Sequence, residues 1–292
     1  MSDADKGSLI KSIRVVSTGS GGQHKEHRFG SWKPSLWWVL LSRSWVDIPI
    51  NVYVIDHRDG LVLFDAGLDL AVANDPNYFP GAAGRFFARR LFRLKMGPDD
   101  TLTKKLSGLG LSISNVCTVV VSHLHFDHVG GIAEVPQAEL LVAREEWDQL
   151  SGAHPERDFF LQEHIEVPGA KWHQIEFSPT DDSVLSPFGH YYDVMGDGSM
   201  VLLSTPGHTE GSLSMLVRAE GYPPLLLVGD LTYDVEMLMK DRTPGTGNKP
   251  QLHDSYAKVR ALRKMLPDML ILPAHDPKAA AALNEMTGVV AC

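Results

Sequence analysis

The chain has 292 residues, of which 43% are hydrophobic and 22% are charged, and its 36 acidic and 27 basic residues give a formal net charge of −9. Enough apolar residues are present for a packed core, which excludes a disordered or collagen-like chain. The acid excess argues against a nucleic-acid partner, because phosphates are bound by clustered Lys and Arg side chains.

The start of the chain is polar, and no apolar stretch of signal-peptide length follows it. No apolar run approaches the roughly 20 residues that a membrane helix needs. The sequence has only 2 cysteines, too few for a disulfide framework, and this usage fits a reducing compartment. We therefore expect a soluble, cytoplasmic protein with no membrane partner.

The first third of the chain is predicted to be rich in strands, because it contains short runs of β-branched or aromatic residues. These runs are residues 13–16, 36–41, 50–55 and 61–64. The turn-forming residues 56–60 lie between the last two runs and predict a hairpin.

Residues 81–97 have a different pattern. Phe86, Phe87, Leu91 and Leu94 alternate with arginines at helical spacing, which predicts an amphipathic helix with a basic face. Two interpretations stay open: a solvated face above a core stripe, or a lid over a pocket.

After residue 115 the sequence alternates between buried strands and helices. A helix is predicted over residues 254–266, with Asp254 as its N-cap and Pro267 as its stop. Strands are predicted at 116–121, 200–204, 214–217, 224–228 and 269–272. This alternation predicts an α/β sandwich with mixed sheets, and since no linker divides the sequence, we expect one domain over residues 1–292.

A cluster of metal-ligand residues directly follows the strand at 116–121. His123, His125, Asp127 and His128 lie within six residues. Without a positive ion, three imidazoles beside a carboxylate would compete for protons, whereas a divalent cation binds neutral imidazoles and a carboxylate together. Because extended chain alternates sides, His123 and His125 can face one point while Asp127 and His128 face another. The spacing suggests two adjacent metals.

Three further candidate ligands follow later strands. They are His208 in Ser204–His208, Asp230 in Val228–Asp230 and His275 in Leu272–His275. In each case a short turn of small residues delivers the side chain to the carboxyl end of a strand, where α/β sites usually lie. A lone His in such a turn is more often a surface residue, but the three together with the first cluster favour a metal site.

These residues, with the sequence Phe64-Asp-Ala-Gly67 upstream, resemble the metallo-β-lactamase fold superfamily over about residues 50–276. The resemblance implies an αββα sandwich of two mixed sheets flanked by helices, with a site for two divalent metal ions, usually Zn²⁺, at one sheet edge. It implies the following ligands: His123, His125 and His208 for the first metal, Asp127, His128 and His275 for the second, and Asp230 as the bridge. Asp65 would brace a ligand imidazole.

Three features narrow the resemblance to the quorum-quenching N-acyl homoserine lactone lactonases. The bridging position is an Asp, Asp230, and Tyr233 follows it in the Asp-x-x-Tyr spacing of that group. His275-Asp276 also resembles the tail motif of the group. The alternative for Tyr233 is a core tyrosine that only packs.

The resemblance implies a dinuclear hydrolase that opens a small-molecule lactone or similar ester by attack of a metal-bridging hydroxide. Tyr233 would donate a hydrogen bond to the oxyanion, and Asp127 would return a proton to the leaving oxygen. Alternatives within the fold are hydrolysis of a phosphotriester, as in methyl parathion hydrolase, or of a thioester, as in glyoxalase II. An iron-based redox protein would bring a flavin domain, and a non-catalytic sensor would have lost ligands.

The sequence also departs from the family pattern. We expect an N-terminal extension, an insertion near 70–100 and another between 150 and 200. Candidates for an apolar substrate pocket, chosen by apolarity alone, are Phe79, Phe86, Phe87, Met237 and Met239. The alternative for each of them, and the commoner one, is a core residue. The hydrophobic N-terminal segment suggests a homodimer.

Overall fold

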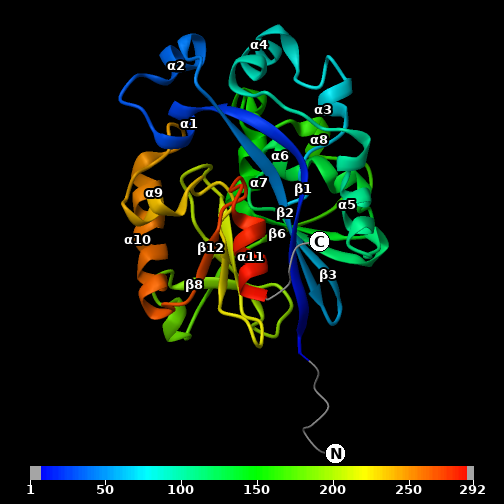
Figure 1. The fold of residues 1–292 in the computed structure, drawn as a ribbon, viewed down its shortest axis with the longest axis vertical. Coiled ribbons are helices and arrows are strands. Elements are labelled where there is room, and N and C mark those ends of the chain that lie inside the picture. Colours follow the sequence, from blue (N-terminus) through cyan, green and yellow to red (C-terminus); the bar gives the residue numbers. More distant parts are fainter. Residues whose placement is uncertain (1–7, 288–292) are drawn as a thin grey trace, which may run out of the picture.

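The computed structural model describes residues 8–287, which fold into two six-stranded sheets with helices on their outer sides (Figure 1). Each sheet contains both parallel and antiparallel pairs. The predicted αββα sandwich of two mixed sheets is therefore confirmed.

The first sheet has the strand order β1-β2-β3-β4-β5-β6. Its strands are β1 (Ile10–His24), β2 (Trp45–His57), β3 (Gly60–Phe64), β4 (Val116–Val120), β5 (Glu139–Ala143) and β6 (Lys171–Ile175). The predicted hairpin is present, because β2 and β3 pair antiparallel with His57 opposite Gly60. The strands from β3 to β6 are parallel, so the residues that follow β3 and β4 lie at one edge.

The second sheet has the order β12-β11-β10-β9-β8-β7. Its strands are β7 (Ser178–Pro179), β8 (His190–Asp193), β9 (Met200–Ser204), β10 (Leu213–Val217), β11 (Leu225–Leu227) and β12 (Leu270–Leu272). The predicted strands 200–204, 214–217, 224–228 and 269–272 correspond to the last four of these. Since β11 and β12 are parallel, the loops that follow them lie side by side.

The main core fills the space between the sheets. Successive residues of a strand face opposite sides, so Tyr53 of β2 contacts the other sheet while Val54 faces outward. Helix α5 (Leu102–Gly108) covers the outer face of the first sheet, and α10 (Lys249–Met265) covers that of the second. The remaining helices are α1 (Lys25–Phe29), α2 (Ser35–Leu41), α3 (Ala71–Asn74), α4 (Gly81–Leu91), α6 (Phe126–Val129), α7 (Arg144–Trp147), α8 (Gln162–Ile165), α9 (Val235–Met239) and α11 (Ala279–Thr287).

Residues 36–41 form helix α2, so our prediction of a strand was wrong. Short apolar runs fit a strand or a helix equally well by periodicity. Pro34 sets the start of the helix, and its carbonyl accepts a hydrogen bond from the Trp37 N–H at 3.0 Å. Trp38 and Val39 are the buried residues of this helix, whereas a strand between two layers would be buried on both sides.

The helix predicted over 81–97 ends at Leu91. Beyond it the chain becomes extended because Arg93 exchanges two backbone hydrogen bonds of 3.0 Å with Gly22, and Lys95 does the same with Ser20 at 2.8 and 2.9 Å. Pairing with β1 therefore overrides the helical pattern. Ala88 is the one buried residue of α4. The interpretation of this helix as a solvated face above a core stripe would require several buried apolar residues.

Helix α10 begins at Lys249, five residues before the predicted start, because Asn248 rather than Asp254 is its N-cap. The Asn248 Oδ1 accepts a hydrogen bond from the Gln251 N–H at 3.4 Å, and a proline follows in the first turn, as is common at helix starts. None of the helices that the structure describes is both long enough and apolar enough to cross a bilayer.

Candidate active site

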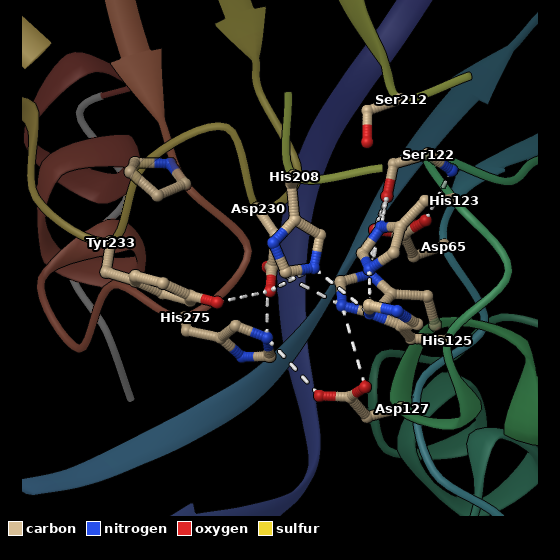
Figure 2. A network of polar contacts seen from close by, with 12 residues as sticks. Asp65, Ser122, His123, His125, Asp127, His208, Ser212, Asp230, Tyr233 and His275 are labelled. Carbon is tan, nitrogen blue, oxygen red and sulfur yellow. Dashed lines mark hydrogen bonds and ion pairs between the residues drawn. The ribbon is translucent and has the colours of Figure 1, made fainter. Parts of the chain in front are cut away.

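The seven predicted metal ligands, which come from four separate segments of the chain, lie together at one end of the sandwich, and Figure 2 labels six of them. Their positions follow from the sheets, since each loop leaves the carboxyl end of a strand. His123 and His125 follow β4, Asp127 and His128 lie on α6, and His208, Asp230 and His275 follow β9, β11 and β12.

Three imidazoles form the first group. The His125 Nδ1 lies 3.0 Å from the Nε2 of His123 and 3.0 Å from the Nε2 of His208. Burial lowers the pKa of His123, and it lowers the pKa of His208 to about 3. Three neutral rings with converging nitrogens are a typical donor set for a divalent transition metal.

The second group consists of Asp127, His128 and His275. The Asp127 Oδ1 lies 3.8 Å from the His128 Nε2, and its Oδ2 lies 3.4 Å from the His275 Nε2. Two imidazole nitrogens and a carboxylate oxygen therefore face one point beside the first group.

Asp230 lies between the two groups. Its Oδ1 is 3.1 Å from the His275 Nε2 and 3.5 Å from the His128 Nε2, while its Oδ2 is 3.6 Å from the His208 Nε2. Burial opposes its ionisation, but His275 and His128 hold its pKa well below the usual value. One carboxylate thus presents an oxygen to each group, which is the arrangement that a bridging ligand requires.

Buried polar atoms without a hydrogen bond indicate whether these residues are suited to bind a metal ion. The His128 Nε2 and the Asp230 Oδ1 are buried and 3.5 Å apart, and apart from the ion-pair contacts given above neither atom makes a hydrogen bond. Buried polar atoms are rarely left without a partner because of the desolvation cost. A cation between them would satisfy both atoms, so the donor set fits divalent metal ions.

Asp65 braces the second group. Its carboxylate accepts hydrogen bonds from the Ser122 N–H at 2.7 Å, the Ser122 hydroxyl at 3.0 Å and the His128 Nδ1–H at 2.8 Å. The backbone of Asp65 has φ 66°, a strained region for a residue with a side chain. Because Nδ1 donates to Asp65, the Nε2 is the His128 atom that faces Asp127 and Asp230 and that could bind a metal.

Glu146, which the sequence analysis did not select, is a fully buried residue on α7 that joins two ligand loops. It accepts hydrogen bonds from the Leu124 N–H at 2.9 Å, between His123 and His125, and from the Gly211 N–H at 3.0 Å, beyond His208. Burial raises its pKa to about 7. No sequence signal distinguishes Glu146 from its exposed neighbour Glu145, because the burial of Glu146 depends on tertiary packing.

Tyr233 is buried at the edge of the cluster, and its hydroxyl donates a hydrogen bond of 3.0 Å to the Asp230 Oδ2 (Figure 2). Its ring stacks on the ring of His275 with centroids 5.9 Å apart. Burial raises its pKa well above the usual value, so the phenol keeps its proton. Tyr233 lines the site's cavity, which a tyrosine that only packs in the core would not do.

A cavity of about 380 Å³ opens over the cluster. Asp127, His208, Asp230 and Tyr233 lie on its polar side, and its other walls are mostly apolar. These apolar walls include Ile48, Phe92, Leu94, Phe159 and Phe160.

The five candidates chosen by apolarity do not line this cavity. Phe79, Phe86, Phe87, Met237 and Met239 are absent from the cavity wall. Phe79 instead packs behind it on Phe126, with ring centroids 5.1 Å apart, and Phe86 and Phe87 are exposed on α4. The wall comes from segments that pack together only in the folded chain, so apolarity could not select it.

The two-sheet sandwich and the His/Asp cluster at its edge define the class of protein: a metal-dependent hydrolase. The chain belongs to the metallo-beta-lactamase superfamily, whose family model matches residues 45–275. It is 29% identical over 246 residues to the N-acyl homoserine lactonase AttM of Rhizobium radiobacter, a match that covers 80% of this chain and 84% of AttM.

Solved structures agree on the fold. An N-acyl homoserine lactone hydrolase with N-hexanoyl-L-homoserine at its catalytic metal centre has a TM-score of 0.75 at 21% identity, covering 94% of this chain and 96% of that one. AidC, described as a dizinc quorum-quenching lactonase, has a TM-score of 0.62 at 17% identity, covering 94% and 91%. At 21% and 17% identity, the similarity of these two structures to this chain shows a shared fold and nothing about substrate.

Proposed function

We propose that this hydrolase opens the ring of N-acyl homoserine lactones, or of similar lactones, with two divalent ions, most simply Zn²⁺. The observation that carries the proposal is the position of Asp230, which contacts both ligand groups and the Tyr233 phenol at the base of an apolar cavity. The names of the lactonase relatives and the dizinc description of AidC support the same substrate and metal.

The proposed ligands are those of the two groups with Asp230 shared between them. His123, His125 and His208 would hold one ion, and Asp127, His128 and His275 the other. Bound ions of this type supply Lewis acidity and lower the pKa of a water to about 7. Burial lowers the pKa of His123, His125 and His208, so these rings need no deprotonation on binding. The neighbouring carboxylates raise the pKa of His128 to about 9 and that of His275 above its usual value, so a bound cation would displace a proton from each of these two rings.

The chain's own residues would position the lactone and move its proton. The Tyr233 hydroxyl points at the cluster and would donate a hydrogen bond to the carbonyl oxygen as negative charge develops on it. The Asp127 side chain is 15% exposed, against 6% for Asp230, so it is the more accessible carboxylate. It would take a proton from the water as that water attacks the carbonyl carbon, and would pass this proton to the ring oxygen as the bond between the carbonyl carbon and the ring oxygen breaks. The apolar walls would hold the acyl chain.

The test is Tyr233→Phe, assayed on N-acyl homoserine lactones of several chain lengths, a thioester and an aryl phosphotriester. We expect kcat for the lactones to fall about 100-fold, as when one oxyanion donor is lost, with metal content unchanged. Tyr256→Phe is the matched control, because Tyr256 is a buried tyrosine of α10 away from the cavity. A variant with full lactonase activity would refute the role of the phenol, and a wild type that prefers the thioester or phosphotriester would refute the substrate.

A homodimer stays a prediction. Trp32, Trp37 and Leu41 are 91%, 61% and 65% exposed, and exposed apolar patches of this kind are typical of interaction surfaces.

A further inference from the structure

One buried histidine beside the site belongs to neither ligand group. His27 lies on α1, outside the residues 45–275 that the family model matches, and it lines the cavity with 7% of its surface exposed. Its Nε2 is 3.2 Å from the Tyr233 hydroxyl oxygen, and the two rings meet edge to face with centroids 5.4 Å apart.

The backbone around His27 is held firmly against a neighbouring loop. The His27 carbonyl accepts a hydrogen bond from the Gly245 N–H at 2.8 Å. A Cβ at Gly245 would lie only 2.2 Å from the Glu26 carbonyl oxygen, and one at Gly30 would lie 2.8 Å from the carbonyl oxygen of Thr243. At Gly30 and Gly245 the backbones of the two segments lie so close that a side chain at either position would clash. This contact and the hydrogen bond from Gly245 fix the position of the His27 backbone beside the site.

The direction of the hydrogen bond between His27 and Tyr233 follows from a count of protons. The phenol has one proton, and it donates this proton to the Asp230 carboxylate, which can only accept. The phenol oxygen must then accept from His27, so the imidazole proton is on Nε2. Burial lowers the pKa of His27 to about 4, so the ring is neutral at pH 7 and its Nδ1 carries no proton.

We propose that His27 is a positioning residue for Tyr233, whose phenol oxygen it holds by donating its Nε2–H. This inference rests on the proposed function, in which the phenol stabilises an oxyanion. The Nε2–H polarises the phenol in the direction that strengthens its own O–H as a donor, since hydrogen bonds in a chain reinforce one another. It also keeps the oxygen in place while the O–H turns from Asp230 to the substrate.

The kinetic test uses His27→Ala and His27→Gln. We expect His27→Ala to lower kcat about 10- to 100-fold, the effect of losing about 1.4 to 2.7 kcal/mol of transition-state stabilisation, with little change in KM. His27→Gln should recover most of this loss, because its amide N–H can donate to the phenol. In a Tyr233→Phe background, His27→Ala should cause no further loss, since the group that it positions is gone.

The matched control is His24→Ala. His24 is also buried, packs on Trp38 as His27 does, and bonds to the Arg90 carbonyl rather than to the site. It should leave kcat near the wild-type value. If His24→Ala lowers kcat as much as His27→Ala, or if the loss persists in the Tyr233→Phe background, the role of His27 is structural and the proposal is wrong.

A second readout does not depend on activity. Imidazole ¹⁵N NMR of the metal-free protein, with the signal assigned by its loss in His27→Gln, should find the Nε2–H form, and Tyr233→Phe should shift that signal. An Nδ1–H form, or a signal unmoved by Tyr233→Phe, would overturn the proposal. If the wild type opens no lactone but these signals behave as expected, the proposed substrate fails while the contact between His27 and Tyr233 stands.

Discussion

Asp230→Asn should reduce lactone hydrolysis at least ~1,000-fold, about 4 kcal/mol of transition-state stabilisation. The change keeps the shape of the side chain but removes the charge that faces His275 and His128 on one side and His208 on the other. An amide offers one acceptor oxygen rather than two, so it cannot serve both ligand groups. Bound metal, measured by elemental analysis after gel filtration, should fall together with activity.

Asp276→Asn is the control for this variant. Asp276 is next to His275 in sequence, and its carboxylate accepts a hydrogen bond from the Lys278 N–H at 2.9 Å, which an asparagine can also accept. Metal content and activity should stay near the wild-type values. If Asp230→Asn retains both metal and activity, Asp230 is not a shared ligand and the two-group interpretation of the site is wrong.

Glu146→Ala should destabilise the metal-free protein by about 3 kcal/mol at pH 5, because it leaves the buried N–H groups of Leu124 and Gly211 without partners and creates a cavity. Urea unfolding measures the loss. Glu145→Ala, at the exposed neighbouring position, should change stability by under ~0.5 kcal/mol. Equal losses in the two variants would exclude a specific role for Glu146.

The effect of Glu146 should also depend on pH. Burial raises its pKa from 4.5 to about 7, so the folded protein binds the proton of this carboxyl more tightly than the unfolded chain does. Its stabilising contribution is therefore complete below about pH 4.5 and falls as the pH rises to about 7. The difference in stability between the wild type and Glu146→Ala should be smaller at pH 8 than at pH 5. A larger difference at pH 8 would contradict this assignment.

The candidate ligands lie close together, as expected from the sequence, for a physical reason. Each candidate ligand follows an apolar strand, and parallel strands bring their carboxyl ends to one edge. His208, Asp230 and His275 could therefore be expected beside the cluster at 123–128, although they are far apart along the chain. The sandwich follows from the same strands, whose apolar runs are long enough to distinguish them from loops.

The missed features depend on contacts between distant segments. Glu146 and His27 are polar residues whose burial arises only when their helices pack, and a sequence without this context suggests a solvated residue in both cases. The strand predicted at 36–41 is a helix because local periodicity is ambiguous over six residues. The helix predicted over 81–97 ends early because Arg93 and Lys95 pair with β1, a long-range contact that competes with a local pattern.

Metal titration of the apo protein, with ring opening of an N-acyl homoserine lactone as the readout, tests the account most directly. We expect activity to rise with added Zn²⁺ and to reach its plateau at two ions per chain, with none in the apo protein. Full activity in the apo protein, or a protein that opens no lactone with two ions bound, would contradict the account.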